Sequence, residues 1–231
     1  MDEKHKNLTI HRHLPLRSIS GRPTSVADLR PQCQNVRMLI FLETERMLLR
    51  QFTVHDTELL MELDADPRVM RYITGGEPTP RDEIESDILP AFLSYYQKFP
   101  GYGFWAAIEK STTDFLGWFH YRPAPGDPPD QPELGYRLRY QAWGKGYATE
   151  GSRALIAKGF TAFGVQRVVA STMAVNTASR KVMEKAGMRL VRAFVADWPV
   201  AIPGDEHGDV EYAISRQEWE LNPNAATNNS L

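Results

Sequence analysis

The chain has 231 residues, of which 42% are hydrophobic and 24% are charged, and its formal net charge is −2 at pH 7. This length suits one domain with tails, and the composition is that of a globular protein rather than a disordered, fibrous or membrane-embedded chain. The near balance of charge gives no overall field that would attract nucleic acid or an anionic membrane, so any anion site has to be local. We therefore expect neither nucleic acid nor a membrane among the partners.

The cysteine content and the N-terminus indicate the compartment. Cys33 is the single cysteine of the chain, so no internal disulfide can form and a reducing environment is favoured. No run reaches the roughly 18 apolar residues of a membrane span, and the N-terminus lacks the apolar core of a secretory signal. Asp2 and Glu3 weigh against a mitochondrial transit peptide. We expect a cytoplasmic protein, with mitochondrial targeting as the alternative.

Two tails flank the predicted domain. Pro15, Gly21, Pro23 and Pro31 interrupt the N-terminal segment, and neither a helical nor a strand period survives between them. The sequence therefore predicts a flexible N-terminal tail over residues 1–37, one folded domain over residues 38–221 and a disordered C-terminal tail over residues 222–231.

The first part of the domain predicts one strand followed by helices. Residues 42–52 fit a strand better than a helix. Asp56 is a candidate N-cap for a helix over residues 56–63, and Asp66-Pro67 opens a further helical turn. Thr79-Pro80 starts a longer helix that extends to Tyr96, in which Pro90 is a candidate kink.

The remainder predicts strands that alternate with two helices. A hairpin is expected over residues 104–109 and 115–122, and a Pro-rich loop leads to a strand over residues 133–139. The segments that follow are a helix over 146–163, a strand over 168–172, a helix over 176–187, and strands over 189–196 and 210–215. A strand–helix–strand crossover inside a mostly antiparallel meander predicts a mixed sheet with helices on both faces.

A glycine turn, Gly144-Lys145-Gly146, joins the strand over 133–139 to the following helix. The first N–H groups of a helix are unpaired and converge on one spot, which attracts an anion. Glycine permits positive φ and close approach of the backbone, and Lys145 adds a charge, so a pyrophosphate fits this turn. The same pattern also suits a tight bend without a ligand. Neither GxGxxG nor GxxxxGK followed by Ser or Thr occurs, which excludes the two best-known nucleotide-binding loops.

Three segments occur in a fixed order: Glu133-Leu134-Gly135-Tyr136, then Trp143 to Gly151, then Asn176 to Met188. With them the chain resembles the GNAT acetyltransferase superfamily, and more closely the RimJ/RimL-like branch of ribosomal-protein N-terminal acetyltransferases. The resemblance covers about Leu42 to Glu220. It implies an α/β (α+β) GNAT fold, in which a mixed, mostly antiparallel sheet is splayed in the middle. It also implies acetyl-CoA as co-substrate and no metal.

The resemblance assigns cofactor contacts to particular residues. It implies that the backbone of Leu138 and Arg139 pairs with the pantetheine arm and that Asn176 bonds this arm, although Asn at a helix start is commonly just an N-cap. It places the pyrophosphate at the turn, whose candidate residues are Trp143, Gly144, Lys145, Gly146, Tyr147, Ala148 and Thr149. Trp143 is alternatively a loop-packing residue.

Catalysis on a thioester needs mainly the alignment of an uncharged amine and stabilisation of the oxyanion. Glu133 begins the strand beside the expected thioester and is our candidate base, acting through water; the alternative is a solvated or ion-paired Glu. Many superfamily members protonate the departing thiolate with a Tyr, and that place falls at Met183, which cannot donate. Ser179, one turn earlier, is the substitute that the branch implies, unless no dedicated acid is needed.

We therefore predict an acetyl-CoA-dependent N-acetyltransferase that works by direct attack in a ternary complex on a primary amine, either of a protein N-terminus or of a small molecule. The alternatives are a non-catalytic acyl-CoA-binding module and a small-molecule acetyltransferase of the antibiotic or polyamine type. The acidic loop over 204–209 is a candidate wall for a cationic amine, and a homodimer is left open. Candidates for binding the 3′-phosphate are Arg137, Arg139, Arg180 and Lys181.

Overall fold

The computed structural model describes residues 39–221 except Pro125 and Pro199, so the predicted tails lie outside the described residues. Its elements are β1 (Ile40–Glu43), β2 (Met47–Gln51), α1 (Thr57–Asp64), α2 (Pro67–Met70), α3 (Arg81–Glu83), the π-helical η2 (Ile84–Ile88), α4 (Leu89–Lys98), β3 (Gly103–Glu109), β4 (Phe115–Pro123), β5 (Pro132–Leu138), the 3-10 turn η3 (Tyr140–Ala142), α5 (Tyr147–Ala162), β6 (Arg167–Met173), α6 (Thr177–Lys185), β7 (Arg189–Phe194), the 3-10 turn η4 (Asp205–His207), β8 (Asp209–Ser215) and α7 (Arg216–Glu220).

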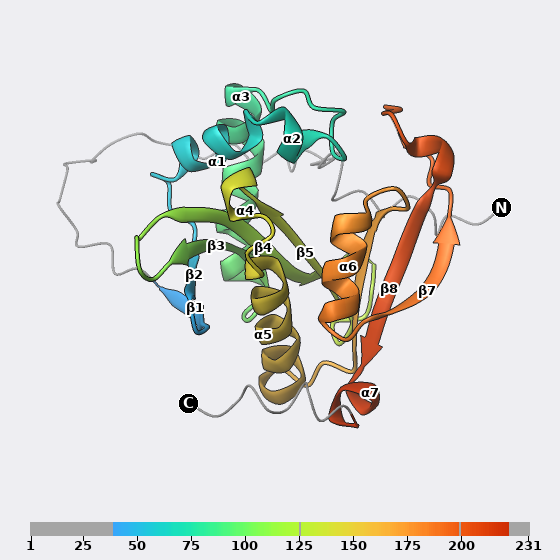
Figure 1. Cartoon of the computed structure of the whole chain (residues 1–231). Coiled ribbons are helices and arrows are strands. Elements are labelled where there is room, and N and C mark those ends of the chain that lie inside the picture. The colour runs from blue at the N-terminus through green and yellow to red at the C-terminus, as the bar shows by residue number, and fades with distance from the viewer. Residues whose placement is uncertain (1–38, 125, 199, 222–231) are drawn as a thin grey trace.

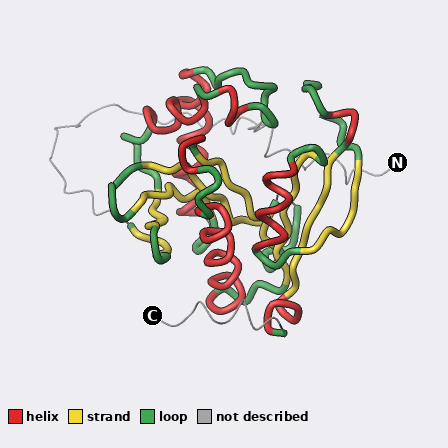
Figure 2. Tube along the Cα trace, in the orientation of Figure 1, coloured by secondary structure: helices red, strands yellow, loops and turns green. Residues whose placement is uncertain are grey.

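One mixed sheet organises the molecule, with strand order β1-β2-β3-β4-β5-β6-β8-β7. Every neighbouring pair is antiparallel except β5 and β6, which run parallel. Helices α5 and α6 lie in front of this sheet in Figure 1, and Figure 2 shows the same arrangement of helices and strands. The predicted α/β architecture is thus confirmed. In the described part of the chain, no helix is long and apolar enough to cross a membrane.

The alternation of side chains along β4 explains why both faces need helices. Phe119 and Tyr121 belong to a buried cluster that includes Leu155 and Phe160 of α5. Trp118, on the opposite face, belongs to a second buried cluster formed with α1 and α4. Because successive residues of a strand point to opposite faces, each face of β4 buries aromatic side chains under its own helices.

The sheet is splayed between β5 and β6. Only Glu133 and Val169 are in register between these strands, whereas β4 and β5 stay paired from Gly117–Leu138 to Pro123–Pro132. Both strands run on toward their carboxyl ends without further pairing, so the two halves of the sheet separate there (Figure 1). This split, predicted from the resemblance, is confirmed, and it opens toward the turn before α5.

The predicted first strand over residues 42–52 is in fact a hairpin, because the chain turns between β1 and β2. The Thr44 N–H donates to the Met47 carbonyl (2.9 Å), and its hydroxyl donates to Glu150 of α5 (2.7 Å). The Arg46 N–H also donates to Glu150 (2.9 Å). These bonds depend on a carboxylate about a hundred residues away, which no local pattern reveals.

The helix predicted from Thr79 to Tyr96 is interrupted by a π-helical turn. α3, η2 and α4 follow one another directly, and η2 ends just before Pro90, near the start of α4. Pro90 has no N–H to continue the regular ladder, and a widened turn is a known way to absorb such a defect. Thr79 does not cap; its hydroxyl donates to Asp64 (2.6 Å).

The predicted N-cap at Asp56 is also wrong in detail, although the helix does begin there. The Asp56 carboxylate makes no bond to the first turn of α1. It instead binds the Arg50 guanidinium at 2.7 and 2.8 Å, and it accepts from the Thr53 N–H. A buried arginine competes successfully for the carboxylate, because an ion pair with two parallel hydrogen bonds is a stronger interaction than a single cap bond to a backbone N–H.

Gly151 allows α5 to lie close against β4. A Cβ atom built at Gly151 would come within 2.3 Å of Phe119 Cζ. Gly151→Ala should therefore lower the free energy of unfolding by about 1–3 kcal/mol, measured by urea denaturation, since overpacking outweighs the helix propensity of alanine. A more stable variant, as expected for Gly→Ala in a helix with room, would contradict this packing.

Candidate active site

The turn from β5 to α5 exposes its backbone because of two glycines. Gly144 and Gly146 have φ of 72° and 86°. A Cβ atom at Gly144 would meet nothing within 4 Å, and at Gly146 only Arg46 Nη2 at 3.4 Å. The left-handed backbone, rather than crowding by other side chains, is therefore what requires glycine here. The ladder of α5 begins with the Glu150 N–H on the Gly146 carbonyl (3.0 Å), which leaves the amides of Tyr147, Ala148 and Thr149 ahead of it.

Arg46, which the sequence analysis did not single out, fixes the orientation of this turn. Its guanidinium donates to Glu150 (2.7 Å) and to the Lys145 carbonyl (2.9 Å), and it lies 4.4 Å from the centroid of the Tyr147 ring. A trans peptide places its N–H opposite its carbonyl, so Arg46 directs the Gly146 N–H away from itself. The anion-binding geometry predicted at the turn thus has a tertiary support from the β1–β2 hairpin.

At the end of β5, where this strand borders the split, some backbone groups already form hydrogen bonds within the protein. The Arg139 N–H donates to Leu116 (2.8 Å), and its carbonyl accepts from Ala142 (2.9 Å). Because backbone groups alternate between the two edges of a strand, the Leu138 N–H points the other way, toward β6. Of the two residues predicted to pair with pantetheine, Leu138 is therefore the better placed.

Trp143 connects the turn to the end of β5 and does not enter the core. Its indole N–H donates to the Leu138 carbonyl (2.8 Å), and the side chain remains 45% exposed. The ring lies 5.3 Å from that of Tyr140. The packing alternative from the sequence analysis therefore describes this contact, and a cofactor contact of Trp143 stays a prediction.

On the other wall, Asn176 caps α6. Its side-chain oxygen accepts from the Ser179 N–H (3.2 Å), and its amide donates to the Thr172 hydroxyl (3.1 Å). The cap is thus present as the sequence analysis allowed, and a contact with pantetheine would be additional. Ser179 lies just inside the first turn, half-buried beside the split.

Tyr136 reaches across to Ser179. The two hydroxyl oxygens are 3.0 Å apart, and the Tyr136 hydroxyl also lies 3.1 Å from the Ser179 carbonyl. Burial raises the pKa of Tyr136 above its ordinary value, and the hydrogen bond with Ser179 opposes this rise only in part. Met183, by contrast, is 1% exposed within the core. Tyr136, which the sequence analysis quoted only as part of a motif, thus supplies a phenol beside Ser179.

Glu133 stands at the closed end of the split, in register with Val169. It is 8% exposed, so the solvated alternative of the sequence analysis is wrong. Burial raises its pKa to about 7; Arg122 acts in the opposite direction, and Asp127 and Glu211 add to the rise. The Nε2 atom of His120 lies 3.8 Å from the carboxylate. A carboxyl group that titrates near neutrality suits general base catalysis.

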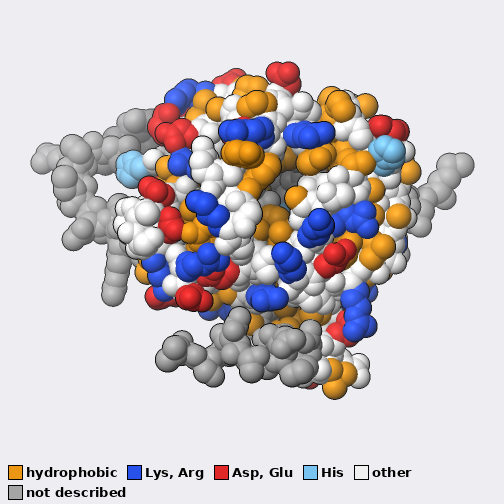
Figure 3. Space-filling view, viewed as in Figure 1, with side chains coloured by type: hydrophobic (Ala, Val, Ile, Leu, Met, Phe, Trp, Pro, Cys, Tyr) orange, Lys and Arg blue, Asp and Glu red, His pale blue; other side chains and the backbone are white. Residues whose placement is uncertain are grey.

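Several cations predicted to bind a phosphate are committed elsewhere. Arg137 binds the buried Asp64 (2.7 Å), Arg139 binds Glu62, and Arg180 donates to the Tyr212 hydroxyl (3.1 Å). Lys145 and Lys181 are exposed. Figure 3 shows that Lys and Arg side chains gather over the middle of the face on which α5 and α6 lie. The predicted contact with the 3′-phosphate is thus less well supported for these three arginines than for Lys181, which is exposed.

The acidic loop predicted as a wall for a cationic amine folds onto itself. Asp205 accepts from the Ile202 N–H (2.7 Å), and Glu206 accepts from the Gly204 N–H (3.0 Å). Asp209 accepts from the Trp198 indole (2.8 Å). These carboxylates thus hold the loop together, and the structure gives no support to an amine-binding wall there.

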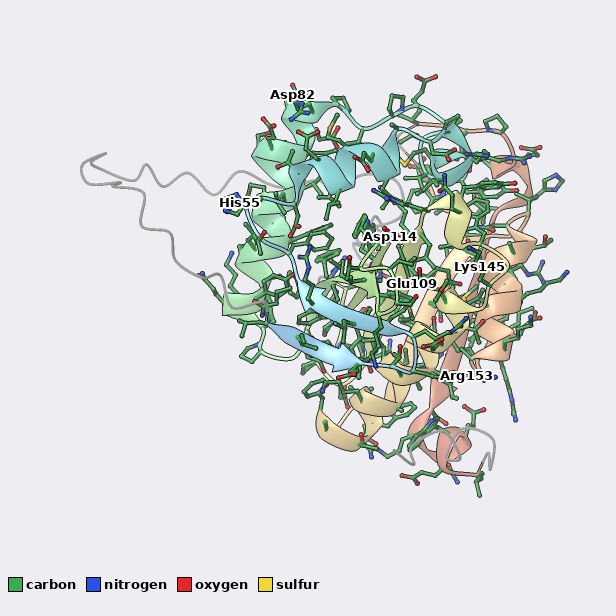
Figure 4. All side chains as sticks on the ribbon, turned by 60° about the vertical axis from the view of Figure 1, so that its left-hand side comes forward. His55, Asp82, Glu109, Asp114, Lys145 and Arg153 are labelled. Atoms are coloured by element: carbon green, nitrogen blue, oxygen red, sulfur yellow. The ribbon has the colours of Figure 1, made fainter. Side chains whose placement is uncertain are left out.

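A cavity of about 390 Å³ lies on the other side of the turn. Its lining includes Glu109 and Asp114 of the β3–β4 hairpin together with Lys145, which Figure 4 shows near one another, and also Glu62 and Asp66. Four carboxylates oppose a phosphate group there. This lining makes the cavity a poor site for a phosphate group.

The donor set fits a diphosphate joined to an extended polar arm. Left-handed glycines and a helix N-terminus lie at one end of an unpaired parallel edge. Within the described residues, no group of three or more His, Cys, Asp or Glu side chains is arranged to hold a metal ion.

Comparison with known proteins agrees with this geometry. The family model of the acetyltransferase (GNAT) domain matches residues 46–189. A relative from Aspergillus fumigatus, named FsC-acetyl coenzyme A-N(2)-transacetylase, is 33% identical over 184 residues, which cover 77% of each chain. Two solved structures share the fold.

The first is RimL, a ribosomal alpha-N-protein acetyltransferase in complex with coenzyme A, with a TM-score of 0.64, 18% identity and coverage of 76% of this chain and 97% of that one. The second is the aminoglycoside acetyltransferase AAC(6′)-Ib in complex with coenzyme A, with a TM-score of 0.59, 21% identity and coverage of 76% and 98%. The family match and the similarity to a named transacetylase identify the cofactor as acetyl-CoA and the reaction as N-acetyl transfer. The chain belongs to the GNAT family of acetyltransferases.

Proposed function

We propose that the enzyme acetylates a primary amine, of a protein N-terminus or of a small molecule, by direct attack within a ternary complex. The observation that carries this proposal is Glu133, a buried carboxyl group with a pKa of about 7 at the closed end of the split. At neutral pH such a group can take up the proton that the acceptor's ammonium ion must lose before its nitrogen can attack. No covalent enzyme intermediate is needed, since the thioester is already activated.

The chain's own groups divide the proton transfers between them. Glu133, directly or through water, accepts the proton that the ammonium ion loses before its nitrogen bonds to the acetyl carbon, and the second proton of that nitrogen goes to the departing thiolate or to solvent. As the carbon–sulfur bond breaks, the Ser179 hydroxyl donates a proton or a hydrogen bond to the sulfur, and Tyr136, 3.0 Å away, orients that hydroxyl. The turn amides from Gly144 to Thr149 hold the pyrophosphate, and the Leu138 backbone and Asn176 border the pantetheine arm.

The names of the similar proteins point to different classes of acceptor. The similar proteins include one named for the N(2) position of FsC, one for ribosomal alpha-N-protein acetylation and one for aminoglycosides. The motifs around Glu133 and Asn176 favour placement in the RimJ/RimL-like branch, which would make a protein N-terminus one acceptor to test.

Gly146→Val should weaken coenzyme A binding by about tenfold, because a branched residue strains the left-handed turn and moves its amides. Titration calorimetry measures the affinity. Gly164→Val is the matched control, since Gly164 is also left-handed (φ 69°) with open space around its Cβ position, but it ends α5 instead of starting it. Equal losses in both variants would show that strain alone explains the effect.

Glu133→Gln should lower kcat about 100-fold or more and leave coenzyme A affinity within about threefold. In the wild type, kcat/KM should fall as the pH drops below about 7, and this limb should vanish in the variant. Acceptors of different amine pKa serve as the control, because a limb due to Glu133 does not follow the acceptor. Unchanged turnover would remove Glu133 as the base.

The same variant gives a stability signature. Folding raises the pKa of the Glu133 carboxyl group from 4.5 to about 7. The free energy of unfolding of the wild type should therefore fall as the pH rises through that interval. Relative to wild type, Glu133→Gln should therefore gain in Tm between pH 5 and pH 8. A melting series across this range separates a folding defect from a catalytic one.

Tyr136→Phe and Ser179→Ala should each lower kcat, by roughly threefold to tenfold, if the two hydroxyls act as one unit. The double variant should then lose little more than either single variant, which a double-mutant cycle of kcat measures. Losses that multiply would mean that the hydroxyls act separately, and no loss in Ser179→Ala would remove its proposed role.

A further inference from the structure

Arg122 is a buried cation whose hydrogen bonds are incomplete. Its side chain lies on β4 and is 3% exposed. Its Nη1 donates to the Pro123 carbonyl (3.2 Å), but Nε and Nη2 have no hydrogen-bond partner in the described part of the chain. Buried polar groups are almost always satisfied, because an unpaired one costs the full penalty of desolvation. The guanidinium therefore has two buried donor atoms that the described residues leave unmatched.

Aromatic rings surround the Arg122 guanidinium, and no carboxylate neutralises it at short range. The guanidinium lies 5.7 Å from the centroid of the Tyr95 ring and 5.4 Å from that of Phe104. No carboxylate among the described residues comes within 4.0 Å of it, in contrast to Arg137, four pairs along the same strands, which binds Asp64 at 2.7 Å. Arg137 is thus neutralised by the fold, and Arg122 is not.

Arg122 lies directly opposite the proposed base. Arg122 and Glu133 are partners in the β4–β5 register, and Glu133 senses the charge of Arg122. Side chains of directly opposed residues project from the same face with Cβ atoms about 4.5–5.5 Å apart. The pair therefore places an acceptor for an amine proton and a fork of donors for an oxygen on the same face, on neighbouring strands.

We propose that Arg122 binds an oxygen of the acceptor, and that the acceptor is an amine with a carboxyl-derived oxygen, carboxylate or carbonyl, on the carbon that bears the amino group. This inference rests on the proposed function of Glu133 and narrows its acceptor. The amine lies at Glu133, while the oxygen completes the hydrogen bonds of Nε and Nη2. Arginine binds such planar oxygen groups through two parallel bonds. Polyamines and aminosugars lack this oxygen and are disfavoured.

The test compares three acceptors with the same side chain: an α-amino acid, its carboxamide and the decarboxylated amine. Wild-type enzyme should show kcat/KM at least about tenfold higher for the acid or the amide than for the decarboxylated amine. The better of the first two identifies carboxylate or carbonyl as the natural partner. Equal kcat/KM for all three would overturn the proposal, while thiol release with any of them keeps the N-acetyltransferase assignment.

Arg122→Met keeps the length of the side chain and removes its donors. It should abolish the preference, lowering kcat/KM at least about tenfold for the acid or amide and less than about threefold for the decarboxylated amine. Equal losses for all three acceptors would indicate a purely structural or electrostatic role and would overturn the proposal. Arg122→Lys, which retains the charge without the fork, should recover part of the preference for the acid.

A binding measurement gives a readout independent of turnover. The N-acetylated amino acid, which is the product, should bind the wild-type enzyme in the presence of coenzyme A by calorimetry, and this affinity should fall at least about tenfold in Arg122→Met. Arg122→Met should keep the coenzyme A affinity and the Tm of the wild type. Loss of coenzyme A binding in the wild type would instead refute the site as a whole, so the two failures are distinguishable.

Discussion

The molecule depends on one incomplete strand pairing. β5 and β6 share a single registered pair, Glu133 with Val169, although each is fully paired with its other neighbour. Parallel strands that diverge leave an edge of backbone donors and acceptors that a ligand can use in place of a strand. Because both strands diverge toward their carboxyl ends, the helices that follow them, α5 and α6, begin at the mouth of the same opening.

The proposed chemistry follows from the position of groups along this opening. The glycine turn stands at the wide end, where Arg46 fixes its peptide planes, and Tyr136 and Ser179 face each other across the middle. Glu133 stands at the closed end, where burial raises its pKa to about 7. A cofactor with a charged head and a long arm can therefore place its reactive end beside a carboxyl group that ionises near neutral pH.

The two faces of the sheet divide the work. The α5 and α6 face carries the cofactor turn and the hydroxyl pair, whereas the α1 and α4 face carries Trp118, His120 and Arg122 with aromatic cover. Glu133, which is paired with Arg122 in the β4–β5 register, projects from the same face as Arg122. An acceptor bound at Arg122 would thus approach from the face opposite the cofactor turn, which agrees with direct attack in a ternary complex.

The sequence by itself determined the order of most elements, the glycine turn, the Asn176 cap, the family and the cofactor, because these depend on local periods and on motifs of contiguous residues. It did not reveal the β1–β2 hairpin, the support of the turn by Arg46, the pairing of Tyr136 with Ser179 or the unmatched Arg122. It also predicted a cap at Asp56 that does not form, and it did not reveal that Arg137 pairs with Asp64. Only the tertiary structure decided these, because each depends on which charged or polar group from a distant segment reaches the residue, and hydrogen-bond and burial energies act between neighbours in space.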